Sequence, residues 1–106
     1  MNPLLFLRKP KTLDESAMGA ARERGEHAQA LLRDEALMGA FAAVERVYME
    51  AWRGSSLDQV ELRERAHIAV SLLNDLKGQI ISYVREGASA SDRIESDRVR
   101  RARANA

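Results

Sequence analysis

The sequence predicts an all-α protein, in which an antiparallel helical hairpin carries a third packed helix. Proline occurs only at positions 3 and 10, so no proline interrupts the chain after its first ten residues. Residues 13–87 are rich in Ala, Leu, Glu and Arg, which have high helix propensities. Large apolar residues in this stretch recur every three or four positions, which is the period of an amphipathic helix.

The chain of 106 residues divides into an extended apolar and basic arm (1–12), a three-helix domain (13–87) and a polar Arg-rich tail (88–106) with the option of a short helix. The formal net charge is +1, but the two ends are basic and the body is acidic. The lack of cysteine excludes disulfides and thiolate metal sites. The apolar run at 4–7 is too short for a signal peptide or a membrane span, so we expect no membrane partner.

The first helix is predicted over about 13–33. The stretch Thr12-Leu13-Asp14-Glu15 fits a capping box, in which a hydroxyl and a carboxylate satisfy the free amides of a helix start. The apolar side of this helix consists mainly of alanines, and Leu31 and Leu32 are its only large anchors. Two interior glycines weaken it, each by about 1 kcal/mol relative to Ala. This helix therefore needs a partner surface.

The second helix is predicted over about 35–53. Asp34 is a favourable N-cap, and Gly54 suits a left-handed stop at the C-terminal end. Trp52 lies just before this stop, and we expect it to fill the apolar end of the hairpin because large aromatic residues at helical spacing usually belong to a core.

The third helix is predicted over about 57–86, from a second capping box at Ser56–Gln59 to a stop at Gly87. Its apolar residues alternate steps of four and three, as in a coiled-coil seam: Leu62, Ala66, Ala69, Leu73, Leu76, Ile80 and Tyr83. This helix would be about 45 Å long, whereas the second would be about 28 Å long. The part of the third helix that extends beyond the second, its overhang, therefore needs cover from the first helix, the arm or another copy of the chain. We expect the core to include Phe41, Val44, Tyr48, Trp52, Leu62, Leu73, Leu76 and Ile80.

Catalytic and metal sites are not indicated. Glu64 and His67 have the Glu-x-x-His spacing of carboxylate-bridged di-iron bundles, but they point about 130–170° away from the seam. Glu23 and His27 form another pair on the weak first helix. The sequence holds no nucleophile elbow, catalytic triad or Gly-rich phosphate loop. We therefore expect no metal, no cofactor and no enzymatic activity.

The two ends of the chain are the predicted binding segments. Proline on both sides of the arm favours an extended segment whose apolar side chains dock on a neighbouring subunit, with basic residues at the rim: Leu4, Leu5, Phe6, Leu7, Arg8, Lys9 and Lys11. The tail arginines contact either nucleic-acid phosphates or an acidic protein surface: Arg98, Arg100, Arg101 and Arg103. No aromatic residues interleave with them, so base stacking is not indicated.

Residues 24–87 resemble a group of small helical proteins of tailed bacteriophages and prophages. The likeness rests on "RGEHAQALLRDEALMGAFAAVERVYMEAWRGSS", "DQVELRERA" and "LLNDLKGQI", although Glu35 stands where a proline is usual. The resemblance implies a structural, head- or connector-associated component of a virion, made in the host cytoplasm. It would be bound in several copies to protein subunits, itself included, through its arms. A DNA-packaging factor that makes non-specific DNA contacts is the alternative, and an inhibitor of host defence is a third.

Overall fold

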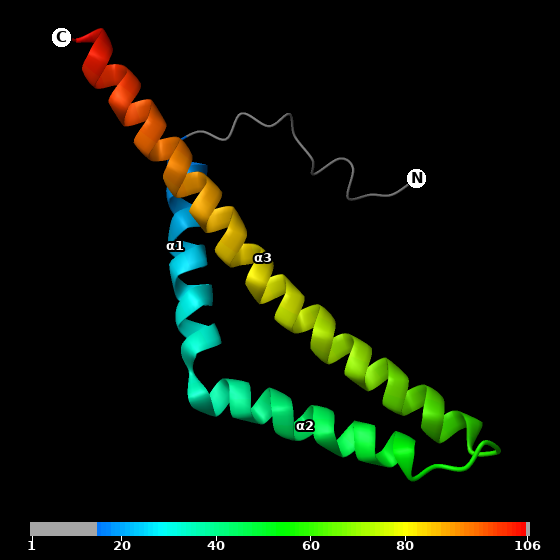
Figure 1. Cartoon of the computed structure of the whole chain (residues 1–106). Helices are drawn as coiled ribbons and strands as arrows, with labels where there is room; N and C mark the ends of the chain where they lie inside the picture. Colours follow the sequence, from blue (N-terminus) through cyan, green and yellow to red (C-terminus); the bar gives the residue numbers. More distant parts are fainter. Residues whose placement is uncertain (1–14, 106) are drawn as a thin grey trace, which may run out of the picture.

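The computed structural model describes residues 15–105 and confirms the all-α prediction for them. It contains the helices α1 (Glu15–Arg33), α2 (Glu35–Arg53) and α3 (Val60–Ala104). They form an open triangle, with α3 as the long side and α1 and α2 as the two short sides (Figure 1). The radius of gyration is 20.4 Å, whereas a compact chain of this length would have about 13 Å.

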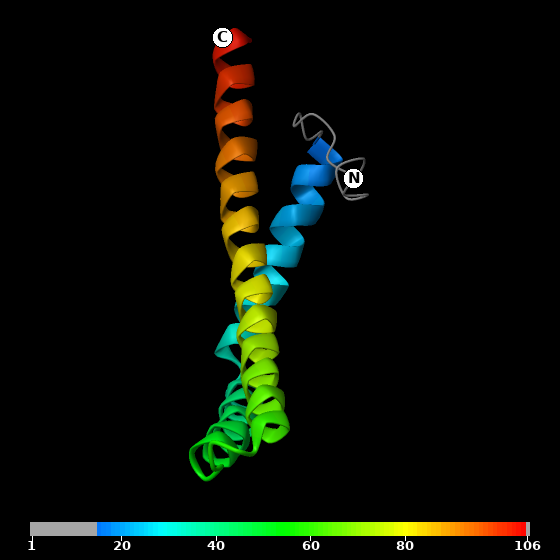
Figure 2. The same ribbon diagram turned by 90° about the vertical axis from the view of Figure 1, so that its right-hand side faces the viewer.

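The triangle is thin but not flat, because the N-terminal part of α1 overlaps α3 in one view and stands beside it in the other (Figures 1 and 2). Its principal extents are 72 × 40 × 15 Å, and one helix with its side chains is about 10 Å across. The view turned by 90° shows how narrow the molecule is in that direction (Figure 2). So thin a molecule has little interior, and no large side chain is fully buried among the described residues.

The corner between α1 and α2 is built by Asp34, as predicted. Its backbone is extended (φ −75°, ψ 114°), and its Oδ1 accepts a hydrogen bond from the Leu37 N–H at 2.8 Å. This side chain satisfies one of the amides that a helix start leaves free. The helix α2 therefore begins at Glu35 and ends at Arg53, with the predicted bounds. Residues 12–14 of the first capping box lie outside the described residues.

The corner between α2 and α3 differs from the prediction in two ways. Gly54 has right-handed backbone angles (φ −80°, ψ −7°), so the predicted left-handed stop is wrong. The third helix begins at Val60 and not at residue 57. The Ser56 N–H does donate to Gln59 Oε1 at 2.8 Å, which is half of the capping box, but the Gln59 N–H donates to the Ser56 carbonyl. Residues 56–59 therefore form a turn before the helix.

The predicted end of the third helix at Gly87 is also wrong, because α3 continues through this glycine to Ala104. The predicted Arg-rich tail is therefore the C-terminal part of α3. Salt bridges of i, i+3 spacing support this part, between Glu95 and Arg98 at 2.9 Å and between Asp97 and Arg100 at 3.8 Å. Packing against α1 also supports it, since Met18 and Ala21 form a buried cluster with Ala90 and the half-buried Ile94.

The helix α1 packs on the C-terminal half of α3, and this is the most extensive helix–helix contact in the described residues. α2 packs less extensively on the N-terminal half of α3, and α1 touches α2 little. Both views show this division of α3 between its two partners (Figures 1 and 2). The predicted hairpin with a first helix packed across it is not confirmed in this form, because α1 and α2 pack on different halves of α3.

Gly25 and Gly87 form the crossing point of α1 and α3. A Cβ on Gly25 would lie 2.8 Å from both the Gly87 Cα and the Tyr83 carbonyl oxygen. A Cβ on Gly87 would lie 2.8 Å from the Gly25 Cα and 3.1 Å from the Ala21 carbonyl oxygen. The two backbones are thus in direct contact, and only glycine fits at either position without moving a helix.

The crossing continues the predicted seam. From Tyr83 the alternation of four and three residues runs on to Gly87, Ala90 and Ile94, with burial at Gly87 and Ala90. Towards its N-terminal end the seam is less well covered: Ala66 is buried, Leu73 and Ile80 are half-buried, and Leu62 and Leu76 are 39% and 53% exposed. The predicted overhang is therefore covered by α1 at its Tyr83 end and open at Leu76.

The observed core differs from the predicted one. Of the predicted members, Phe41 is buried, but Val44, Tyr48, Trp52, Leu62 and Leu76 are exposed. The prediction is wrong for these five because no second layer covers the α2–α3 pair in the single chain. The buried hydrophobic residues are mostly small: Met18, Ala21, Ala28, Phe41, Ala66 and Ala90.

Gly87→Ala should destabilise the protein, and Gly78→Ala should stabilise it. Both glycines lie inside α3, where alanine gains about 1 kcal/mol in helix propensity. At Gly87 this gain is outweighed, because overpacking against a backbone costs about 1–3 kcal/mol. A Cβ on Gly78 has no neighbour within 4 Å, so the gain remains.

Urea denaturation followed by circular dichroism, at one fixed protein concentration, measures both changes in the free energy of unfolding. In α1, Gly25→Ala and Gly19→Ala should show the same contrast, since a Cβ on Gly19 also meets no atom within 4 Å. Equal effects of the two substitutions within either helix would contradict the close crossing.

Candidate functional site

Trp52 lies at the corner between α2 and α3 in a small polar network. The Arg63 guanidinium carbon stands 4.9 Å from the centroid of the Trp52 ring, and Arg63 Nη1 donates to Ser55 Oγ at 2.9 Å. The Ser55 hydroxyl in turn donates to the Trp52 carbonyl oxygen at 2.6 Å. A cation over an indole face contributes about 0.5–1 kcal/mol at an exposed site. Trp52 is 41% exposed, so it braces the corner and does not fill a core.

A shallow cavity of about 230 Å³ opens beside Trp52, between α2 and α3. Its walls are mostly apolar, and the His67 imidazole is the only titratable group besides the Tyr48 phenol. Reaction chemistry needs several polar groups that converge on one point. This cavity offers an apolar surface and not such a constellation. Its lining residues are Tyr48, Met49, Trp52, Ala66, His67 and Val70.

The two predicted Glu–His pairs are exposed. Glu64 and His67 lie on the outside of α3, although the His67 ring also borders the cavity, and Glu23 and His27 are exposed on α1. Within residues 15–105 no group of three or more His, Cys, Asp or Glu side chains is placed to hold a metal ion. In the turn before α3, a hydrogen bond from the Ser56 hydroxyl lowers the pKa of Asp58.

The largest candidate for a functional site is an exposed apolar surface on α2 and the N-terminal half of α3. An apolar patch of several neighbouring exposed side chains is often a functional surface. Exposure here ranges from 37% at Tyr48 to 62% at Val47 and Leu72. We name this surface the apolar face, and it consists of Val44, Val47, Tyr48, Leu62, Ile68, Leu72 and Leu76.

The residues of the apolar face share one geometric relation to the contact between α2 and α3. On α2, Val44 and Tyr48 each stand one position before a half-buried residue, Glu45 and Met49. On α3, each of three leucines likewise stands one position before a less exposed residue: Leu62 before Arg63, Leu72 before Leu73 and Leu76 before Lys77. One position is a rotation of about 100° around a helix.

This shared relation places the exposed apolar residues of α2 and those of α3 on the same side of the helix pair. α2 and α3 run in roughly opposite directions (Figure 1). When two antiparallel helices pack against each other, going one position back along either chain turns the side chain away from the line of contact towards the same side of the pair. Val47 and Ile68 lie further round in the same sense, about 160–180° from the contact, at the outer edges of the pair. The apolar residues of the two helices are therefore parts of one face.

The sequence pattern contained this surface, but the prediction did not identify it. Val44, Tyr48, Leu62 and Leu76 are among the predicted core residues, and Leu72 stands one position before Leu73 of the predicted seam. The spacing of four between Ile68, Leu72 and Leu76 shows that they share one side of a helix. A pattern of this kind cannot tell whether that side is covered by the same chain.

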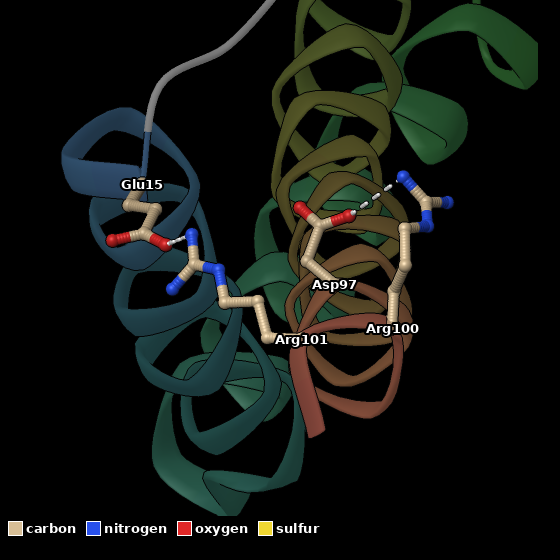
Figure 3. Close-up of polar contacts among 4 residues, drawn as sticks. All are labelled: Glu15, Asp97, Arg100 and Arg101. Carbon is tan, nitrogen blue, oxygen red and sulfur yellow. Dashed lines mark hydrogen bonds and ion pairs between the residues drawn. The ribbon is translucent and has the colours of Figure 1, made fainter. Parts of the chain in front are cut away.

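The predicted tail arginines point in different directions on α3. Arg101 Nη2 contacts Glu15 Oε1 at the start of α1, whereas Arg100 lies on the other side of α3, beside Asp97 (Figure 3). Arg98 pairs with Glu95 on its own helix. Arg103 is exposed in the last turn. Three of these four arginines therefore have an acidic partner, and Arg98 and Arg101 project from a different side of α3 than Arg100 and Arg103.

The predicted docking arm, residues 1–12, lies outside the described residues and stays a prediction. No helix within the described part of the chain is long and apolar enough to cross a membrane. Comparisons with protein-family models, with curated proteins and with solved structures give no match. Functional inference therefore depends on the surfaces described above.

Arg63→Ala should lower the free energy of unfolding by about 1 kcal/mol, because it removes both the contact with the Trp52 ring and the hydrogen bond to Ser55. Urea melts followed by the fluorescence of Trp52, the only tryptophan, report both stability and the ring's surroundings.

Arg65→Ala is the matched control, since Arg65 is exposed on the same helix. It should change stability by less than about 0.5 kcal/mol and leave the emission of Trp52 unaltered. The bracing role of Arg63 would be contradicted if both variants behaved alike.

Proposed function

We propose that the chain is a non-enzymatic structural component of a tailed-bacteriophage particle, present in several copies that associate through the apolar face. The single observation that supports association is the exposure of seven large apolar side chains on one side and along the outer edges of the α2–α3 pair. The resemblance of residues 24–87 to small phage proteins supports the setting in a particle.

The area of the apolar face is of the size that a specific interface needs. Seven side chains that are about half exposed supply on the order of 500 Å² of apolar surface. A standard interface buries about 800 Å² on each partner, with an apolar centre and a polar rim. The apolar face accounts for most of such a centre, and exposed polar residues beside it, such as Glu61 and Arg65, supply a rim of both signs.

The occupant that fits this face best is a second copy of the chain. Stable domains consist of at least two packed layers around a shared core, and the apolar face of the α2–α3 pair has no second layer over it among the described residues. A two-fold axis would stack two identical apolar faces and create the missing second layer. The face also continues the seam that α1 covers further along α3, from Tyr83 to Ile94. Helix-on-helix packing would thus extend along the whole of α3.

Leu72→Glu should abolish self-association without unfolding the chain. Leu72 is 62% exposed in the single chain, so a charge is tolerated there until a partner buries it. An unpaired buried charge costs about 3–5 kcal/mol, which corresponds to a 100-fold or greater rise in the dissociation constant. Sedimentation velocity over a range of protein concentrations measures this constant, and circular dichroism checks the helix content.

Leu57→Glu is the matched control, because Leu57 is 85% exposed in the corner before α3 and lies outside the apolar face. It introduces the same charge and should leave association intact. A wild-type chain that remains monomeric at every concentration, or equal loss of association in both variants, would contradict the proposed use of this face.

The particle setting is tested separately. Mass spectrometry of purified particles from a phage or induced prophage that encodes the chain should detect it in several copies per particle. Its presence only in the soluble fraction of the infected cell, and not in the particles, would contradict a structural role while leaving self-association possible.

A further inference from the structure

A second surface, on the C-terminal half of α3, carries a straight row of exposed arginine and serine side chains. From residue 85 onwards these residues follow one another at steps of four, four, three, four and three, so they share one side of the helix. We name this surface the arginine ridge, and it consists of Arg85, Ser89, Arg93, Ser96, Arg100 and Arg103, all exposed.

The arginine ridge differs from the other arginines of this helix in its electrostatic surroundings. Arg98 and Arg101 project from the opposite half of α3, where Glu95 and Glu15 hold them. On the ridge, only Arg100 has an acidic partner, Asp97, at a long 3.8 Å. Arg85, Arg93 and Arg103 form no ion pair with any described residue. Three of the four ridge guanidiniums therefore keep their donors available.

The neighbouring surface favours an anionic ligand further. A groove between α1 and α3 brings Arg24 beside Arg85 and Arg93, over a floor of Met18 and alanines. Glu86, the one acidic residue in this groove, is paired with Arg24 at 3.6 Å, and the Arg24 guanidinium lies 5.0 Å from the Tyr83 ring centroid. A second depression further along the same helix contains Arg100 and Arg103. Guanidinium groups thus line the ridge from Arg85 to Arg103, 18 residue steps or about 27 Å of helix.

We infer that the arginine ridge binds the phosphate backbone of double-stranded nucleic acid without reading its sequence. Guanidinium groups are well suited to phosphate oxygens, and serine hydroxyls are further donors to them. A length of about 27 Å spans about eight base pairs of a duplex at 3.4 Å each. The ridge carries no aromatic side chain, so it offers no stacking platform for the bases of a single strand. An acidic protein surface is the competing partner, but a repeating polyanion matches a row of four guanidinium groups better than isolated carboxylates do.

The expected measurement is salt-dependent binding of the full chain to a duplex of 20 base pairs and arbitrary sequence, followed by fluorescence anisotropy. Four phosphate contacts give a slope of about −3.6 in log affinity against log salt, so affinity should fall about 100-fold between 50 and 200 mM salt. The double variant Arg93→Gln, Arg103→Gln should reduce the magnitude of this slope by about 1.8, since each phosphate contact contributes about 0.9.

The double variant Arg46→Gln, Arg53→Gln is the matched control. It removes the same charge from two exposed arginines of α2, away from the ridge, and should leave the slope unchanged. Circular dichroism establishes that both variants keep their helix content. The inference is overturned if the wild-type chain does not bind the duplex at 50 mM salt, or if the two double variants weaken binding equally. Binding to polyglutamate but not to the duplex would also overturn it, in favour of an acidic protein partner.

Discussion

The backbone contact between Gly25 and Gly87 is the constraint on which the rest of the structure depends. Because neither residue has a side chain, α1 and α3 approach until the Cα of one glycine occupies the space that a Cβ of the other would need. This approach lets small residues on both sides, Ala21 and Ala90 among them, become buried. Two glycines that would each weaken an isolated helix by about 1 kcal/mol thereby form the best-packed part of the molecule.

The same contact explains why the molecule is open. With α1 held along the C-terminal half of α3, the Asp34 corner directs α2 towards the other half of α3 (Figure 1). There the apolar side chains are larger, but only two helices meet, so each helix leaves one side uncovered. The buried part of the protein thus consists mainly of alanine and glycine, while leucine, valine and tyrosine residues remain at the surface. This inversion of the usual distribution is what favours a partner for the apolar face.

The long α3 also separates two chemically different surfaces. Its N-terminal half carries most of the apolar face, and its C-terminal half carries the arginine ridge. A rigid helix of 45 residues keeps these surfaces at fixed positions relative to each other. Association of copies through one end would therefore present several arginine ridges at the other, in a regular arrangement. A protein that must join its own copies and also contact a polyanion needs such a separation, because charges inside an apolar interface are costly.

The sequence by itself determined the features that depend on interactions within a few residues. The absence of proline after residue 10 and the helix-forming composition predict helices, and Asp34 marks the start of α2 because its side chain reaches an amide only three residues away. Only the tertiary structure decided the role of Gly87. In isolation a glycine followed by Ala-Ser-Ala is typical of a helix end, and it becomes a helix interior here because Gly25, 62 positions earlier, lies against it. The sequence also shows that Leu62 and Leu76 share a side of α3 and that Arg100 and Arg101 are neighbouring basic residues. It did not show which of these residues α1 and α2 cover, since that depends on where distant helices cross.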